Sequence, residues 1–335
     1  MSPTGRRLRT VLTALAIGLT VSGAAHAETW RMATKQPADS PEGQVFQFFA
    51  DKVAEYSDGD LTVRIYPNEQ LGKTDAVMEQ MQQGTIQLYA EGSTYMDKWV
   101  PDISWVSAAF IFDDRDHWVR FVNTDLVKGW YAEAAEKAHV TVLGDPTALL
   151  RGPYRVMVAN KDIQTFDDIE GLKLRMHPDK LAHALWTNLG ADVKTLAWTD
   201  VYQAISKDIV EAVNSPIALV ESMRFQEVAP HIIRHDEYYQ SIAFMMNQAA
   251  FDALSEANQQ ALLKAHAEAG TFSEELMTEA ADESIARMKE TGVTFVDIDR
   301  APFVEAMQKF YGDLATKGEL PDGYLEAVEA TRSSS

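Results

Sequence analysis

The sequence predicts an α/β protein of two domains arranged as a clamshell, with one long helix that spans both domains. Two observations predict the domains: strand and helix patterns alternate through a first block that ends near Leu150, and they alternate again through a second block. A third observation predicts the long helix. One helical pattern runs from Ser255 to about Thr291, roughly 50 Å at the helical rise per residue, which exceeds one small domain.

The first block begins with alternating apolar residues and then changes to helical spacing, in which apolar residues recur every three or four positions. Its predicted strands cover residues 29–34, 61–67, 86–92 and 139–144, and its predicted helices cover residues 44–57 and 75–84. Strands that alternate with helices indicate a mainly parallel sheet with helices on both faces.

The second block repeats the alternation. Its predicted strands cover residues 154–159, 171–176, 193–197 and 242–248, and its predicted helices cover residues 180–190 and 199–206. Asn214, Ser215 and Pro216 have turn-forming side chains and indicate a polar turn. Gly270 interrupts the long helical pattern and predicts a bend there.

The two blocks suggest domain boundaries. We assign residues 28–152 and 241–280 to the first domain and residues 153–240 and 281–335 to the second. In such folds ligands bind where domains meet and where strands end at their carboxyl termini, so the sequence predicts a site between the two domains.

The first 27 residues have the pattern of an export signal. Three arginines precede an apolar run, residues 11–22, that is too short to span a bilayer easily, and Ala25-His26-Ala27 forms a small-residue cleavage site. We expect cleavage after Ala27, so that the mature chain begins at Glu28 outside the cytoplasm.

The composition excludes several functions. The chain has 50 acidic residues against 30 basic ones, and loss of the three leader arginines leaves 27, a net charge of −23 that disfavours nucleic acid and anionic lipid. The absence of cysteine excludes thiolate catalysis, iron–sulfur clusters and thiolate zinc sites. The histidines show no HExxH spacing, and we predict neither a metal nor a cofactor.

The segment 151–216 carries the strongest functional signal. Arg155 and Arg175 lie at the ends of predicted strands, and Trp198 precedes a helix start at Thr199. Arginine holds a carboxylate through two parallel hydrogen bonds and keeps its charge. Because no nucleophile with a neighbouring base accompanies these residues, the segment indicates recognition of an anion and not an enzyme.

Several segments together resemble one known family, over essentially the whole mature chain. They are residues 40–72, the run GLKLRM at 171–176, residues 189–205, the turn at Pro216, and LSEANQQALL at 254–263. With these segments the chain resembles the substrate-binding proteins of tripartite ATP-independent periplasmic (TRAP) transporters, the DctP-like family. The resemblance implies a periplasmic-binding-protein clamshell that closes on a small organic acid, delivers it to the membrane permease subunits, and works as a monomer. Some members of the family bind their ligand together with a cation, and the sequence leaves that alternative open.

The resemblance also implies roles for individual residues. Arg175 of GLKLRM corresponds to the residue that pairs with the ligand carboxylate, and Trp198 to the aromatic residue that packs on the ligand. Arg155 corresponds to a second basic position, although Arg151 is close enough in sequence to be that second clamp instead.

The remaining implied contacts are less direct. Family members often have asparagine where this chain has Ser215, with Asn214 one place earlier, so either residue fits the polar contact. Glu91 and the loop around Gln36 correspond to contacts with the distal end of the ligand. The run Ala108-Ala109-Phe110 departs from the family, in which a proline usually precedes the aromatic residue.

The sequence leaves open the identity of the ligand and two alternative functions. Two arginines permit a C4-dicarboxylate, a keto acid or a sugar acid, whereas one effective arginine would suit a monocarboxylate, or a zwitterion with Glu91 as counter-charge. Within binding proteins, the alternative is a receptor for an ATP-driven transporter or a sensor. The alternative from a different class is a secreted hydrolase. It would need a serine–histidine–acid set or paired carboxylates in the cleft, and the chain has no GxSxG motif.

Overall fold

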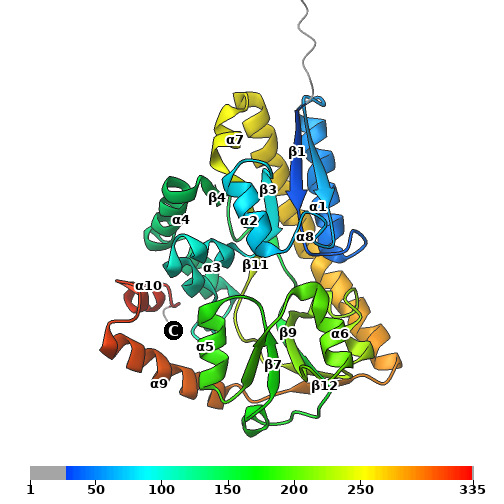
Figure 1. Cartoon of the computed structure of the whole chain (residues 1–335), viewed down its shortest axis with the longest axis vertical. Coiled ribbons are helices and arrows are strands. Elements are labelled where there is room, and N and C mark those ends of the chain that lie inside the picture. Colours follow the sequence, from blue (N-terminus) through cyan, green and yellow to red (C-terminus); the bar gives the residue numbers. More distant parts are fainter. Residues whose placement is uncertain (1–27, 334–335) are drawn as a thin grey trace, which may run out of the picture.

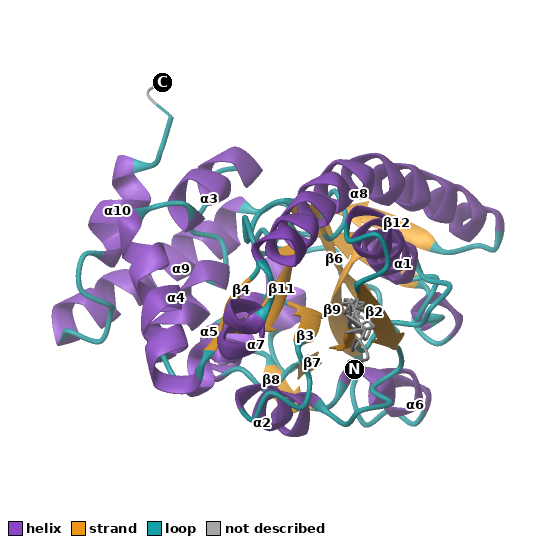
Figure 2. Cartoon of the chain, turned by 90° about the horizontal axis from the view of Figure 1, so that it is seen from above, coloured by secondary structure: helices purple, strands orange, loops and turns teal. Residues whose placement is uncertain are grey.

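The computed structural model describes residues 28–333 and has the expected α/β architecture of two sheets joined by a long helix (Figures 1 and 2). The predicted leader, residues 1–27, lies outside the described residues. In the described part of the chain, no helix is both long and apolar enough to cross a membrane.

The first sheet has the strand order β2-β1-β3-β11-β4, and β5 pairs with β11 beside this path. Its strands are β1 (Glu28–Ala33), β2 (Leu61–Tyr66), β3 (Leu88–Glu91), β4 (Val140–Val142), β5 (Leu149–Leu150) and β11 (Ser241–Asn247). All seven residues of β11 are buried, as expected for a strand in the interior of a sheet.

The second sheet has the order β12-β10-β6-β9-β7-β8. Its strands are β6 (Arg155–Ala159), β7 (Lys173–Met176), β8 (Asp192–Thr195), β9 (Ala212–Pro216), β10 (His231–Arg234) and β12 (Thr294–Asp297). Three connections join the two sheets: residues 151–154, residues 235–240, and the helix that precedes β12.

The expectation of a mainly parallel sheet is wrong. Among the described strands, five pairings are parallel and five are antiparallel. In the first sheet, the reason is that the chain leaves the sheet after β5 and returns to it in β11. When β11 comes back from the second sheet, it enters the first sheet antiparallel to β3, β4 and β5.

The expected turn at Asn214-Ser215-Pro216 is also wrong, because these residues form the end of β9. This strand lies between β6 and β7, and all five of its residues are buried. Pro216 occupies the last position of the strand, opposite Arg155, where the missing N–H costs least. Burial on both faces therefore outweighs the turn preference of asparagine, serine and proline.

Ten α-helices accompany the two sheets in the described residues. They are α1 (Pro41–Tyr56), α2 (Thr74–Gln82), α3 (Arg115–Val122), α4 (Asp125–Ala138), α5 (Lys180–Asn188), α6 (Val201–Ser206), α7 (Gln248–Ala253), α8 (Glu256–Glu290), α9 (Ala301–Lys317) and α10 (Tyr324–Ala330). Helix α1 begins where Ser40 Oγ accepts from Gly43 N, and Gly43 packs so tightly that an added Cβ would collide with the Pro37 and Ala38 carbonyls.

Helix α8 confirms the predicted long helix. It begins after Ser255, whose hydroxyl caps Asn258 N, and its 35 residues pass from the first sheet to the second (Figure 1). Gly270 does not interrupt it. A Cβ at Gly270 would lie 3.0 Å from the Ala148 carbonyl oxygen, so the glycine allows α8 to approach the chain just before β5 closely.

The C-terminal helices contact the region around α3 (Figure 1). The hydroxyl of Tyr311 in α9 donates to the Ala109 carbonyl oxygen at 2.6 Å. The hydroxyl of Tyr324 in α10 donates to the Trp105 carbonyl oxygen at 3.2 Å. His117 in α3 bonds to the Val328 carbonyl oxygen at 2.8 Å. Residues after 300 thus pack on elements from the first half of the chain, although our proposed division places them with the second domain.

Candidate ligand-binding cleft

A cleft between the two sheets contains most of the predicted site residues. It encloses about 460 Å³, open solvent included. The lining residues are Lys35, Gln36, Glu91, Thr94, Tyr95, Arg151, Arg155, Arg175, His177, Trp198, Asn214, Pro216, Leu219, Tyr238 and Gln240. Six of the seven predicted residues are among them, and Ser215 is not.

Arg175 is a buried cation in β7, with only 4% of its surface exposed. Its Nε and Nη2 both donate to the Leu196 carbonyl oxygen, at 2.9 and 2.7 Å, which fixes the plane of the guanidinium. Among the described residues, no carboxylate forms an ion pair with it. Burial lowers the pKa of Arg175 to about 10, so it remains charged at neutral pH.

Trp198 lies beside Arg175 and opens the 3₁₀ turn that precedes α6. Its ring centroid is 5.4 Å from the Arg175 guanidinium carbon, and its ring meets Phe225 edge-on at 5.0 Å. Trp198 Nε1 is buried and has no hydrogen-bond partner among the described residues. The indole therefore holds the cation from one side and adds an apolar wall to the cleft.

Arg155 has one weakly placed carboxylate partner. At the start of β6, its Nε donates to Glu237 Oε2 at 3.4 Å and its Nη1 donates to Gln240 Oε1 at 3.1 Å. Its guanidinium carbon lies 4.2 Å from the centroid of the Tyr238 ring. Three groups from the connection 235–240 thus hold Arg155 at the cleft.

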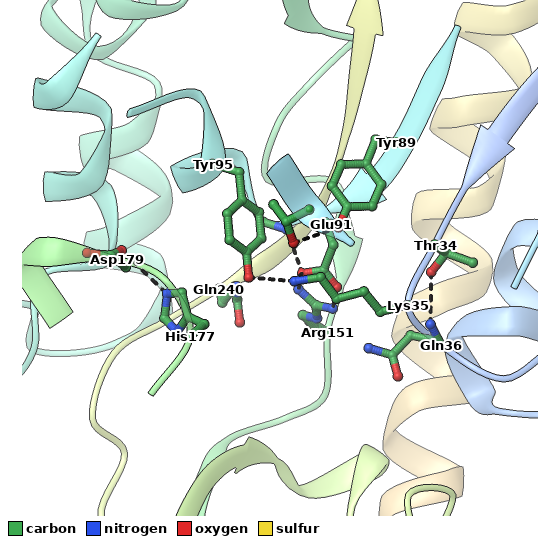
Figure 3. A network of polar contacts seen from close by, with 12 residues as sticks. Thr34, Lys35, Gln36, Tyr89, Glu91, Tyr95, Arg151, His177, Asp179 and Gln240 are labelled. Carbon is green, nitrogen blue, oxygen red and sulfur yellow. Dashed lines mark hydrogen bonds and ion pairs between the residues drawn. The ribbon is translucent and has the colours of Figure 1, made fainter. Parts of the chain in front are cut away.

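Arg151 is held far more firmly. Its Nε donates to Glu42 Oε1 at 2.9 Å and its Nη2 to Glu42 Oε2 at 3.2 Å. Its Nη1 donates to Glu91 Oε2 at 3.0 Å and its Nη2 also contacts Glu91 Oε1 (Figure 3). Two carboxylates therefore compensate this guanidinium before any ligand arrives. Arg155 has more capacity left for a ligand and fits the second clamp better than Arg151.

Glu91 is enclosed by positive groups. Lys35 Nζ lies 3.9 Å from Glu91 Oε2 and donates to the Tyr95 hydroxyl at 2.6 Å (Figure 3). Burial alone would raise the pKa of Glu91, but Arg151 and Lys35 outweigh it and lower the pKa to about 2. In contrast, burial raises the pKa of Glu42, which lies behind Arg151, to about 7.

The structure separates Asn214 from Ser215, which the sequence leaves as alternatives. Asn214 lines the cleft, its Oδ1 lies 3.1 Å from His235 Nε2, and its buried Nδ2 has no described partner. Ser215 is fully buried and its Oγ donates to the Pro216 carbonyl oxygen at 2.9 Å. Consecutive side chains of a strand point to opposite faces, which places Asn214 and not Ser215 at the cleft.

Gln36 also lies at the cleft, just beyond the end of β1. Its backbone N–H donates to Thr34 Oγ1 at 3.2 Å, and its buried Oε1 has no described partner (Figure 3). With Asn214 Nδ2 in β9, this gives the cleft an open acceptor and an open donor on opposite sides, in addition to the open donor Trp198 Nε1. Such a pair suits a hydroxyl-bearing ligand.

Sequence reasoning missed six polar or aromatic lining residues: Lys35, Thr94, Tyr95, His177, Tyr238 and Gln240. Tyr238 and Gln240 had a weak signal, because the polar run HDEYYQ stands between two apolar strands where the chain changes sheets. The others follow strand ends and carry no motif. His177 contacts Asp179, the N-cap of α5, at 3.4 Å.

The family departure at Ala108-Ala109-Phe110 is a buried turn. Phe110 has a φ of 58°, which is uncommon for a bulky residue, and its N–H donates to the Glu237 carbonyl oxygen at 2.7 Å. This bond ties the turn to the connection that carries Glu237, the partner of Arg155.

The cleft offers binding groups. None of the fifteen described residues that line it is a serine or a cysteine. In residues 28–333, no three histidine, aspartate or glutamate side chains gather as ligands for a metal ion.

Comparison with known proteins gives consistent matches. The family model "Bacterial extracellular solute-binding protein, family 7" matches residues 32–317. The 2,3-diketo-L-gulonate-binding periplasmic protein of Escherichia coli is 28% identical over 285 residues, 84% of this chain and 85% of that protein. The C4-dicarboxylate-binding periplasmic protein of Rhodobacter capsulatus is 25% identical over 310 residues, 91% and 92% of the two chains.

A solved structure is similar over nearly the whole described chain. It is a TRAP periplasmic solute-binding protein from Roseobacter denitrificans with bound β-D-glucuronate. It aligns with a TM-score of 0.82 and 25% identity, and the alignment covers 91% of this chain and 100% of that chain.

Proposed function

The chain belongs to the bacterial extracellular solute-binding protein family 7, which the sequence resembles, and on that premise we propose that it is the receptor of a TRAP transporter. It captures a small organic acid by its carboxylate and delivers it unchanged to the membrane permease. One observation carries the proposal: Arg175 is a buried guanidinium in the cleft without a carboxylate partner among the described residues.

The ligand that fits best carries one carboxylate and several hydroxyl groups. Arg175 offers the one lining cation without a described carboxylate partner, because Arg151 pairs with Glu42 and Glu91 and Arg155 pairs with Glu237. Open hydrogen-bonding atoms on Gln36 and Asn214 suit hydroxyl groups. Among the acids that the sequence leaves open, this favours a sugar acid or a hydroxylated keto acid over a C4-dicarboxylate.

The proposed contacts divide between the two sheets. Arg175 holds the carboxylate, with Trp198 against the ligand and Arg155 as the second clamp. Asn214 binds from the second sheet, and Gln36 and the region of Glu91 meet the distal end from the first sheet. Closure of the two halves about their three connections traps the ligand, and the ligand shifts the open–closed equilibrium only as far as it prefers the closed form.

The proposal includes the location and state of the protein. Membership of an extracellular binding-protein family places it outside the cytoplasm. We propose cleavage after Ala27, a monomeric mature protein in the periplasm, and partners limited to the organic acid and the permease subunits, with no nucleic acid or lipid. Mass spectrometry of the exported protein should give an N-terminus at Glu28.

A thermal-shift screen of ligand-stripped protein against an organic-acid library tests the function. An acid at 100 times its dissociation constant should stabilise the folded protein by about 2.7 kcal/mol. A hit should then be recovered unchanged from the complex. No shift with any acid, from a protein that melts cooperatively, would refute the proposal, and conversion of the hit would identify an enzyme instead.

A further inference from the structure

A buried cluster at the cleft consists of Arg151, Glu42, Glu91 and Lys35. Glu42 is fully buried at the start of α1, and Glu91 lies at the end of β3 with 4% of its surface exposed. Arg151, which is 5% exposed, lies where the chain leaves β5 for the second sheet. It bonds both carboxylates, and its contact with Glu91 is visible in Figure 3. The ligand contacts proposed above leave the role of Arg151 and Glu42 unexplained.

The geometry occupies both oxygens of Glu91. Arg151 Nη1 donates to Oε2 at 3.0 Å, Arg151 Nη2 contacts Oε1, and Lys35 Nζ lies 3.9 Å from Oε2. A bidentate guanidinium pair is the strongest arrangement that a carboxylate forms in proteins. Glu91 lines the cleft, yet its charge is already compensated, so it offers no counter-charge to a ligand ammonium group.

At pH 8, above the pKa of about 7 to which burial raises Glu42, the charges of the cluster are balanced, with two cations against two carboxylates. A buried ion without a partner raises the free energy of the folded protein. Replacing one member of the cluster with a neutral residue therefore leaves an uncompensated charge, which favours a ligand group of the opposite charge. Asp179 caps α5 and contacts His177, and it is not among the lining residues. Outside the cluster, Glu237 compensates Arg155, and Arg175 remains for the ligand.

We infer that Arg151 sets the charge of the ligand: by compensating Glu42 and Glu91, it restricts the cleft to acids with one carboxylate and no ammonium group. The inference rests on the proposed function and deepens it. Arg151 thereby acts as a specificity residue that excludes amino acids, while Glu42 and Glu91 exclude dicarboxylic acids by preventing a surplus of positive charge.

Two series of matched acids test the inference by calorimetry at pH 8. Gluconate, glucosaminate and glucarate share a six-carbon chain, and glycerate, serine and tartronate share a three-carbon chain. In each series the second acid replaces a hydroxyl with an ammonium group, and the third acid carries a second carboxylate. Wild-type protein should prefer the first member of the series that it binds.

Three variants change the balance in opposite directions. Arg151→Gln frees Glu91 and should reduce the preference for the hydroxy acid over the amino acid at least tenfold. Glu91→Gln and Glu42→Gln each leave one positive charge uncompensated. Each should reduce the preference for the hydroxy acid over the dicarboxylic acid at least tenfold. Glu42 is not among the lining residues, so its effect reports charge and not a lost contact.

The exposed ion pair Lys137–Glu133 in α4 offers matched controls. Lys137→Gln and Glu133→Gln remove the same charges far from the cleft and should leave both preferences within twofold of wild type. Each variant is first checked for a cooperative melt. If Arg151→Gln does not fold, the two glutamate variants still decide whether the charge balance of the cluster excludes dicarboxylic acids.

The outcomes distinguish a failure of the inference about Arg151 from a failure of the proposed receptor function. Unchanged preferences in the folded cluster variants, or wild-type preference for the amino or dicarboxylic member, would overturn the inference while leaving a receptor for acids. Failure of the wild type to bind any monocarboxylate while it binds other acids would do the same. Failure to bind any acid in the library would remove the proposed function as well.

Discussion

The guanidinium of Arg175 lies against the indole of Trp198, with 5.4 Å between its central carbon and the ring centroid, and both side chains line one cleft. The Leu196 carbonyl oxygen fixes the same guanidinium through two hydrogen bonds. A cation so held is oriented before a ligand arrives, which reduces the ordering cost of binding.

Arg175→Met should weaken ligand binding about 10- to 150-fold, the equivalent of one charge-assisted hydrogen-bonded pair. The melting temperature of the ligand-free protein should hardly change, because the arginine has no carboxylate partner in the described structure. Arg175→Lys should also bind poorly, since an ammonium cannot reproduce the planar fork. Arg64→Met, at an exposed position of β2, is the control and should bind with wild-type affinity. Wild-type affinity in either Arg175 variant would exclude Arg175 from the site.

Asn214→Ala should weaken binding about 2- to 10-fold, the value of one hydrogen bond, because Asn214 lines the cleft with an open donor. Ser215→Ala should change the dissociation constant less than twofold, because this hydroxyl bonds the Pro216 carbonyl oxygen away from the cleft. Calorimetry on the pair distinguishes the two neighbours. A larger loss from Ser215→Ala would mean that the family position, and not the observed lining, identifies the contact.

Asp97 should make the protein less stable as the pH rises. Burial and the nearby Asp179 raise the pKa of Asp97 from 3.8 to about 6. A raised carboxyl pKa means that the folded state favours the protonated form, so this stabilisation is present below pH 3.8 and is lost as the pH rises to about 6. Asp97→Asn stays neutral and should be more stable than wild type at pH 7.

Urea unfolding of both proteins at pH 4, 6 and 7.5 measures this effect. The advantage of Asp97→Asn should grow between pH 4 and 6 and then stay level. An advantage that is the same at all three pH values would instead indicate a packing effect of the asparagine.

Gly270→Ala in α8 should lower the free energy of unfolding by roughly 1–3 kcal/mol, because its Cβ would lie 3.0 Å from the Ala148 carbonyl oxygen. Gly312→Ala in α9 is the matched control, with no atom within 4 Å of the added Cβ. It should stabilise the protein by roughly 0.4–1 kcal/mol through the unfolded state. Chemical denaturation of the two variants should therefore give changes of opposite sign, and equal signs would contradict the close approach of α8 to Ala148.

The sequence predicts those features that a continuous stretch of residues determines. The Ser255 cap and the helical spacing after it predict α8 almost to the residue. Arg175 and Trp198 are recognised because each lies in a segment that resembles a known family, and six of the seven predicted residues do line the cleft.

Features that depend on distant residues escape such reasoning. Nothing in the local sequence pairs Arg151 with Glu42, 109 residues away, or with Glu91, 60 residues away. The strand β9 was missed because its final residues favour turns when considered alone, and only the strands on either side of it reverse that preference.

The place of β11 in the first sheet has a consequence for how such receptors can diverge. β3 ends at Glu91 and β11 begins at Ser241, yet the two strands are neighbours, and the residues between them build most of the second sheet. A single genetic crossover therefore cannot exchange one half of the cleft intact. Substitutions within the cleft avoid this obstacle, and under the inference above a single codon change at Arg151 would alter the ligand preference.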